Sequence, residues 1–347
     1  MTVGLRHDPA TSDFRAMAEL DTWLARQSEP VLEPELPIID PHQHFWRRAL
    51  GDYLPDALLA DAAGQRVIGT VFIECRTAHR QTGPDAMRPV GETDFVVETT
   101  AGAPPWLAAG VVGFADLTLG PRVRPVLEAQ IAAGRGRFRG IRHPLRWEAT
   151  GIGMYGRQHP AGLALDLDFR RGFAELAPLG LSFDAWLFHT QLGELLDLAR
   201  AFPETTIIVN HGGGPLGVGR HAGRRQEIFG LWRERIAALA ACPNLVMKVG
   251  GFGMLYAGFD FHAATAPPDS AALAVAWRPY VETCLEHFGP GRCMFESNFP
   301  VDRQSCNYRA LWNAFKRLTA GLPAEERAAL FHGTAARVYR LEEAAPG

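Results

Sequence analysis

The chain has no apolar run long enough to cross a bilayer, and its first residues contain no apolar segment of the kind that directs export. It also has no block of basic residues, because 35 lysines and arginines stand against 38 acidic residues for a formal net charge of −3. That balance argues against nucleic acid or an anionic membrane as a partner and favours a small molecule. We therefore expect a soluble, cytoplasmic protein.

Paired cysteines and nucleotide-binding loops are lacking as well. The five cysteines are an odd number, and no two of them form a C-x-x-C pair. This pattern is typical of buried thiols in a reducing compartment and argues against a disulfide framework. No G-x-G-x-x-G follows an early strand, and the glycine-rich stretch 212–219 lacks the Gly-Lys-Ser/Thr of a phosphate loop. Nucleotide binding is therefore not indicated.

What the chain does contain is a repeated alternation of strand-like apolar runs with segments of helical periodicity. The expected strands are 38–42, 67–74, 107–116, 138–143, 181–186, 206–211, 245–249 and 293–297. The expected helices are 122–133, 169–177, 192–202, 225–241, 271–288, 309–320 and 324–339. A doubly wound open sheet alternates in the same way, but eight strands favour an α/β fold of the (β/α)8 TIM-barrel type.

The first 36 residues differ from the rest of the chain. They are polar, with one amphipathic candidate helix at 13–26 and an extended linker at 29–37. We expect residues 1–36 to form an N-terminal helical arm and residues 37–347 to form the barrel. Such an arm packs either on its own barrel or on a second subunit, so a homodimer is possible.

Polar side chains stand at the ends of the expected strands, where a TIM barrel collects its chemistry. His42 and His44 are two residues apart, so an extended strand directs both to the same side. The other candidates at or after strand ends are Glu74, Arg142, Arg146, His189, His211, Lys248, Glu296, Asn298 and Asp302. Taken as a set, these residues favour a functional site over a series of unrelated caps and surface groups.

The residue types suggest a metal-assisted or base-assisted reaction. Neutral imidazoles bind divalent ions such as Zn²⁺, and an open position on the ion acidifies water or polarises a carbonyl. A general base or acid is also needed, and Asp302, Glu296 or an unligated histidine could serve. Two arginines at one strand end, Arg142 and Arg146, suit a carboxylate held by paired hydrogen bonds.

Several stretches resemble the amidohydrolase superfamily, and more narrowly its amidohydrolase-2 group of metal-dependent hydrolases, which includes sugar-acid and pyrone-dicarboxylate lactonases. They are IIDPHQHFW, VFIECR with GPDAMRPVGET, FRGIRHPLRW, FDAWLFHTQL, IIVNHGGGP, MKVGG, MFESNFPVD and LFHGTAARVYRL, spread over residues 37–341. The resemblance implies a barrel whose metal ligands are His42, His44, His189 and His211. It also implies an Asp at the end of strand 8, where this chain has Asn298, an amide that cannot act as a carboxylate base.

The resemblance implies that Arg142 and Arg146 hold a substrate carboxylate, and Asp302 could replace the missing Asp. Some members of the lactonase group work without metal, so a divalent ion, zinc in the first place, is expected without being required. We expect a hydrolase that opens a lactone or ester of a small organic or sugar acid. The expected catalytic residues are His42, His44, His211, Asn298 and Asp302, and the expected substrate-binding residues are Glu74, Arg142, Arg146, His189 and Lys248. The alternatives are a decarboxylase or hydratase of an unsaturated or aromatic acid, and a catalytically silent barrel that binds a sugar acid.

Overall fold

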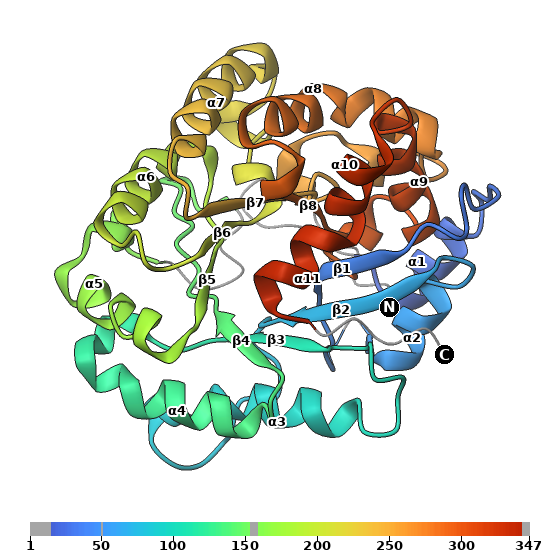
Figure 1. Cartoon of the computed structure of the whole chain (residues 1–347). Helices are drawn as coiled ribbons and strands as arrows, with labels where there is room; N and C mark the ends of the chain where they lie inside the picture. Colours follow the sequence, from blue (N-terminus) through green and yellow to red (C-terminus); the bar gives the residue numbers. More distant parts are fainter. Residues whose placement is uncertain (1–14, 50, 153–158, 342–347) are drawn as a thin grey trace.

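Eight parallel strands form the centre of the molecule (Figure 1). The structure is a computed structural model that describes residues 15–49, 51–152 and 159–341. The strands lie side by side in chain order: β1 (Ile38–Gln43), β2 (Val67–Ile73), β3 (Gly110–Gly113), β4 (Phe138–Ile141), β5 (Ser182–Ala185), β6 (Ile207–Val209), β7 (Leu245–Val249) and β8 (Cys293–Phe295). Each expected strand overlaps one of these, in the expected order.

The sheet closes on itself just beyond the ends of β1 and β8. The His44 amide donates to the Phe299 carbonyl at 2.8 Å, and the Asn298 amide donates to the His42 carbonyl at 2.9 Å. Gln43 and Phe299 form a parallel bridge at the same place. The prediction of a (β/α)8 barrel is therefore confirmed, and its closing seam brings the β1 and β8 site residues together.

Helices cover the outside of the barrel (Figure 1). They are α2 (Pro55–Asp61), α3 (Val90–Thr99), α4 (Arg124–Ala133), α5 (Leu167–Phe173), α6 (Leu192–Ala201), α7 (Arg225–Ala240), α8 (Ser270–Phe288), α9 (Tyr308–Leu318) and α10 (Ala324–Ala328), whereas α11 (Thr334–Tyr339) lies at one end of the barrel. No helix between β2 and β3 was expected. The pattern concealed α3 because its buried side includes the polar residues Glu92 and Thr93, which breaks the apolar periodicity.

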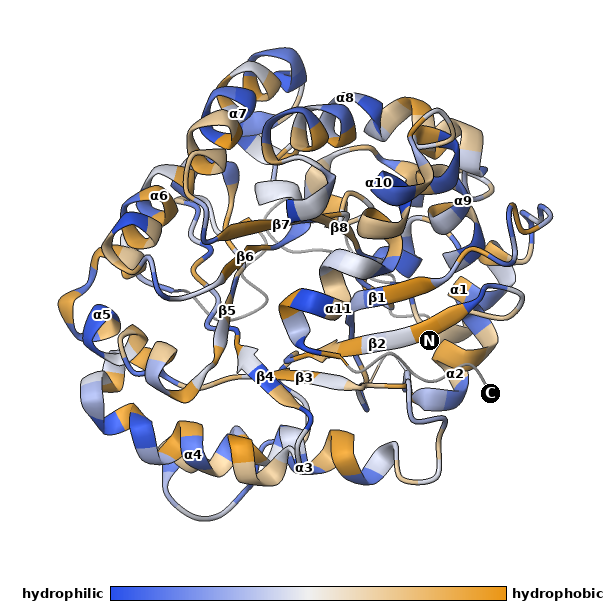
Figure 2. Cartoon of the chain, viewed as in Figure 1, coloured by the Kyte–Doolittle hydropathy of each residue, from blue (hydrophilic) through white to orange (hydrophobic). Residues whose placement is uncertain are grey.

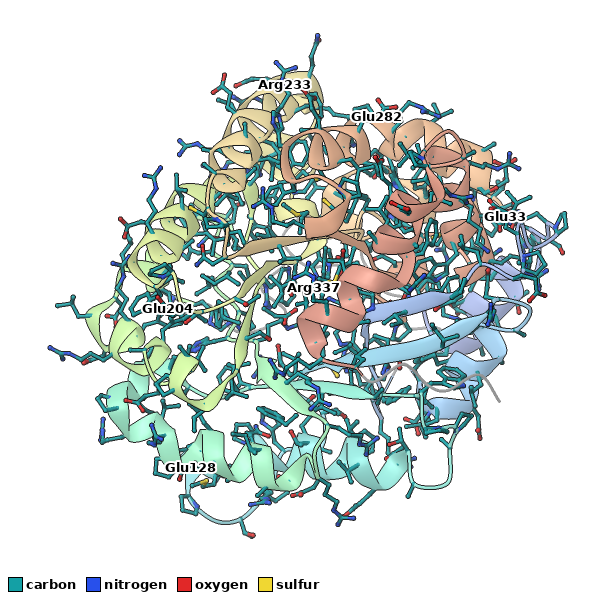
Figure 3. The ribbon with its side chains drawn as sticks, in the orientation of Figure 1. Glu33, Glu128, Glu204, Arg233, Glu282 and Arg337 are labelled. Atoms are coloured by element: carbon teal, nitrogen blue, oxygen red, sulfur yellow. The ribbon has the colours of Figure 1, made fainter. Side chains whose placement is uncertain are left out.

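Apolar residues lie along the strands and on parts of the surrounding helices (Figure 2), and the buried ones form two layers. Outward-facing residues such as Phe72 and Phe183 pack under the helices in the large core. A smaller cluster groups Ile73 and Ile208 of the strands with Val338 and Tyr339 of α11. The last helix therefore plugs one end of the barrel, and the carboxyl ends of the strands remain for the site. Charged residues of the outer helices, such as Glu128 of α4 and Arg233 of α7, project away from this core (Figure 3).

The N-terminal arm packs on the barrel of its own chain. Its helix α1 (Met17–Leu24) lies within the expected range 13–26, whose first two residues are outside the described part. The Trp23 indole N–H donates to the Ala264 carbonyl at 2.9 Å, and the Leu32 amide donates to Asn313 Oδ1 of α9 at 2.9 Å. In the described part of the chain, no helix is both long and apolar enough to cross a membrane.

Candidate active site

A cavity of about 380 Å³ opens at the carboxyl ends of the strands. Six of the residues expected in the site line it: His44, Glu74, Arg142, Arg146, His211 and Asn298. The other four, His42, His189, Lys248 and Asp302, are not among the lining residues. The sequence therefore located the mouth of the barrel, but the structure separates residues that face the cavity from residues that lie behind them.

His44 stands at the floor of the cavity in a fixed orientation. Its Nδ1 lies 2.8 Å from the Ile73 carbonyl, which can only accept, so we assign the ring proton to Nδ1. Burial, and then the charge of Arg142, hold the pKa of His44 well below its usual value, so the ring is neutral. The lone pair on Nε2 consequently faces Asn298 Oδ1, a second acceptor, at 3.4 Å.

Asn298 is held in place from behind by Asp302. The Asn298 Nδ2 donates to Asp302 Oδ1 at 2.7 Å, and the Gly253 amide donates to Asp302 Oδ2 at 2.8 Å. Both carboxylate oxygens are thus engaged, and burial raises the pKa of Asp302 well above its usual value. We expected Asp302 to return over the barrel mouth as a base. The structure places it instead behind Asn298, where it fixes the orientation of the amide.

His211 and Glu296 form a buried pair beside this floor. Glu296 Oε1 accepts from the His211 amide at 2.9 Å and lies 2.8 Å from its Nδ1. With the ring proton on Nδ1, the Nε2 lone pair of His211 is directed away from Glu296. Burial lowers the pKa of His211, and Glu296 opposes the shift. Glu296 was weighed only as an alternative base, although it lies two residues before Asn298 on the same strand end, the spacing that singled out His42 and His44.

His42 lies beneath the cavity in a ring of charged groups. Its Nδ1 is 2.7 Å from Glu296 Oε2 and 3.4 Å from Lys248 Nζ, and its Nε2 is 3.2 Å from Arg142 Nη1. A proton on Nδ1 faces the Glu296 carboxylate and leaves Nε2 to accept from Arg142, so we assign that tautomer. Burial and then the Lys248 charge hold the pKa of His42 well below its usual value.

Lys248 is fully buried and belongs to the barrel interior. Its Nζ donates to Asp184 Oδ1 at 2.7 Å, and Asp184 also accepts from Asn210 Nδ2 at 2.9 Å. We expected Lys248 to bind substrate, whereas the structure places it under His42, at the opposite side of that ring from Arg142. Burial lowers the pKa of Lys248 below its usual value, and the Asp184 charge opposes only part of this shift.

The two arginines of the β4 end differ in their surroundings. Arg142 Nε donates to Glu74 Oε1 at 2.8 Å, and its Nη2 donates to the Glu74 carbonyl. The planar guanidinium of Arg142 is therefore engaged by Glu74. Arg146 instead stacks on the Trp186 indole with its Cζ 3.9 Å from the ring centre. Of the pair, Arg146 is the arginine better placed to meet a substrate.

His189 lies apart from the other three histidines that were expected to bind a metal. Its Nδ1 accepts from the Leu216 amide at 3.3 Å, and its ring centre is 5.4 Å from that of His221. Burial, and then His221, lower its pKa to about 4. The sequence expected His189 as a metal ligand, but the candidate metal group in the described part of the chain consists of His42, His211 and Glu296.

The donor atoms near the floor fit a divalent cation. Ligand atoms of His42, His211 and Glu296 lie within 4.8 Å of one another and are buried, and a bound cation would displace the ring protons that otherwise face Glu296. His44 Nε2 and Asn298 Oδ1 do not belong to this group, and their lone pairs face each other without a proton between them. Neutral imidazoles with a carboxylate are the ligand types that zinc prefers.

Two arginines that the sequence reasoning did not select also line the cavity: Arg48 and Arg76. Both follow the predicted ends of strands, β1 for Arg48 and β2 for Arg76, so their position along the chain was the available signal. Their direction was not predictable, because a loop side chain has no periodicity that fixes which way it faces.

A barrel with buried histidines and carboxylates at the carboxyl ends of its strands is the architecture of a TIM-barrel enzyme. Comparison with known proteins defines the family. A profile of the amidohydrolase family matches residues 39–341. The chain belongs to the amidohydrolase family.

Curated relatives and solved structures agree with this assignment. The uncharacterized protein y4mH of Sinorhizobium fredii is 34% identical over 331 residues, which cover 88% of this chain and 99% of that protein. L-fucono-1,5-lactonase of Burkholderia multivorans is 29% identical, with 88% of this chain and 97% of that protein covered. An amidohydrolase from Burkholderia multivorans, crystallised with bound zinc, has a TM-score of 0.69 at 29% identity, with 88% of this chain and 99% of that chain covered.

Proposed function

We propose that the protein hydrolyses a lactone of a small hydroxy acid or sugar acid. The observation that carries the proposal is the relationship between His44 and Asn298. In the resting state, the His44 Nε2 lone pair faces the Asn298 Oδ1 acceptor at 3.4 Å. When His44 takes a proton, that unfavourable contact becomes a hydrogen bond, which offsets part of the cost that burial and the Arg142 charge impose on the imidazolium of a general base.

The proposed reaction follows from this arrangement. His44 Nε2 removes a proton from water, and the water oxygen attacks the lactone carbonyl. The bond between the carbonyl carbon and the ring oxygen breaks, and His44 returns the proton to the departing oxygen. The product is an open hydroxy acid, which ionises to a carboxylate and one proton. Arg146, supported by the Trp186 ring, holds the acidic or hydroxylated part of the substrate.

A divalent ion fits the same floor. His42, His211 and Glu296 would hold it, and the zinc-bound relative from Burkholderia multivorans supports zinc as the metal. When bound, such an ion lowers the pKa of water and polarises a carbonyl. Lys248 and Arg142 contact His42 from opposite sides and keep its ring in place.

The test is a screen of five- and six-membered aldonic lactones, with proton release followed in a pH-stat and the product acid identified by mass. We expect at least one lactone to be opened, and His44→Gln to lower kcat by roughly 10²–10⁴-fold. Carbon dioxide release from an aromatic acid, with every lactone left intact, would establish the decarboxylase alternative. Binding of sugar acids without turnover of any substrate would establish the silent barrel.

A further inference from the structure

The cavity has an excess of positive charge that the hydrolysis of a neutral lactone does not require. Among the described residues that line it, four are arginines and one is a carboxylate, Glu74. Glu74 is already paired with Arg142 at 2.8 Å. A cleft with such an excess attracts and holds anions.

Arg48 is fixed at the rim of the cavity by two contacts. Its Cζ lies 4.0 Å from the centre of the Trp46 ring, and its Nη2 donates to the Cys75 carbonyl at 2.7 Å. The Trp46 amide donates to the Tyr53 carbonyl at 2.8 Å, and the Tyr53 amide donates to the Trp46 carbonyl at 3.0 Å, so the backbone of Trp46 is held in place. Arg48 makes no ion pair with a described carboxylate through its side chain, so its remaining N–H groups are available to a ligand.

Arg76 follows Cys75, the residue whose carbonyl accepts from Arg48, and lines the same cavity. Its φ of +64° belongs to a conformation that residues other than glycine seldom adopt. Glu92 supports this turn, because its Oε1 accepts from the amides of Cys75 and Thr77 at 2.8 and 3.0 Å. Arg76 forms no hydrogen bond or ion pair with any residue that the structure describes. A buried carboxylate thus maintains a strained turn that presents an unpaired cation to the cavity.

Trp46 connects the rim of the cavity to its floor. The ring centres of His44 and Trp46 are 6.1 Å apart and nearly parallel, and Arg48 lies on Trp46. Trp46 therefore lies next to both the Arg48 guanidinium and the general base. A few bonded carbon atoms are enough to connect a carbonyl at the floor to an anionic group at the rim.

We propose that Arg48 and Arg76 form a subsite for a carboxylate, and that the substrate is a lactone that retains a free carboxylate, such as the monolactone of a dicarboxylic sugar acid. This inference rests on the proposed lactone hydrolysis. The planar fork of each guanidinium matches the two oxygens of a carboxylate. The carboxylate at the rim orients the ring so that its carbonyl lies against His44, and hydrolysis then produces a dicarboxylate.

The experiment compares two lactones of the same ring size, a hexaric acid monolactone and the corresponding neutral hexonic lactone. The variants are Arg48→Gln and Arg76→Gln. The matched control is Arg47→Gln, because Arg47 is the neighbour of Arg48 but pairs with Asp52 at 3.2 Å and does not line the cavity. We expect each rim variant to lower kcat/KM for the acid lactone roughly tenfold to hundredfold, mainly through KM. The neutral lactone and the control variant should change less than twofold.

Calorimetric titration provides a readout that does not depend on turnover. Hexarate should bind the unaltered protein more tightly than hexonate, and the difference should disappear in both rim variants. Equal losses for the acid and the neutral lactone would overturn the subsite, and inorganic phosphate that binds the rim more tightly than hexarate would overturn the assignment to a carboxylate. Hexarate binding that depends on Arg48 and Arg76, in a protein that opens no lactone, would support the subsite and reject the proposed hydrolysis.

Discussion

The hydroxyl of Tyr339 lies 2.9 Å from Oδ1 and 3.1 Å from Oδ2 of Asp184. Tyr339 is the last residue of α11, and Asp184 lies inside the barrel on β5. Asp184 in turn holds Lys248 at 2.7 Å, and Lys248 contacts His42 at 3.4 Å. A helix at the far end of the chain is thereby connected to a residue directly under the active site.

This chain of contacts predicts that Tyr339→Phe lowers kcat and leaves KM unchanged, because Tyr339 reaches the site only through Asp184 and Lys248. The lost hydrogen bond to a charged partner should also reduce the free energy of unfolding by about 1–3 kcal/mol. Tyr53→Phe is the matched control, since Tyr53 is equally buried and donates to Asp61 at 2.9 Å. Both variants should lose stability, as measured by urea unfolding. A similar fall in kcat in both would show that Tyr339 acts on stability alone.

Glu296→Gln should reduce kcat by roughly 10²–10⁴-fold, the range for groups that set up proton transfer. The substitution keeps the shape but removes the charge that contacts both His211 and His42. Steady-state kinetics with the lactone found in the screen provides the measurement. The control is Glu148→Gln, a buried glutamate that pairs with Arg220 outside the cavity. Full activity in Glu296→Gln would remove Glu296 from the site.

Metal content should follow the group that the structure assembles. Elemental analysis of the purified protein should find about one zinc per chain, the number expected for a single catalytic zinc site. His42→Ala and His211→Ala should lose the metal, because both belong to the buried group with Glu296. His189→Gln should retain it, because His189 is bonded to the Leu216 amide instead. If His189→Gln also lost its zinc, His189 would belong to the metal ligands, as the sequence suggested.

His189 also predicts a pH dependence of stability. Burial lowers its pKa from 6.5 to about 4 in the folded state. Between these values the unfolded chain binds a proton that the folded protein does not, so unfolding becomes more favourable as the pH falls. Glutamine does not titrate. The stability deficit of His189→Gln relative to the unaltered protein should therefore shrink by roughly 2–3 kcal/mol between pH 7 and pH 4.5, measured by urea unfolding. A deficit that stays constant over this range would contradict the buried, neutral ring.

Gly251→Ala should impair the His211–Glu296 pair. Gly251 has a φ of +66°, and an added Cβ would lie 2.6 Å from Cγ and 2.7 Å from Cβ of His211. The His211 side chain must then leave its present position, which disturbs its contact with Glu296, so we expect kcat to fall while the barrel still folds. Circular dichroism and kinetics separate the two effects. Gly291→Ala is the control, because its Cβ would meet open space. An active Gly251→Ala variant would show that the ring position is not critical.

The sequence by itself determined the order of the strands and the end of the barrel that carries the chemistry. Alternating apolar runs and helical segments leave few arrangements, and the eightfold count favoured the barrel that the structure shows. The period of two along a strand predicted that His42 and His44 point to the same side, and their ring centres lie 5.0 Å apart. The sequence did not predict α3, because buried polar residues such as Glu92 interrupt the apolar pattern of this helix.

The tertiary structure decided which side chains face the cavity and which support them. Lys248 and Asp302 stand at strand ends in the sequence, yet one pairs with Asp184 inside the barrel and the other anchors Asn298 from behind. These directions depend on partners that are far away in the chain, such as Asp184 for Lys248 and Gly253 for Asp302. No local pattern encodes such a partner, because a buried charge turns toward whichever opposite charge or donor the fold brings within reach.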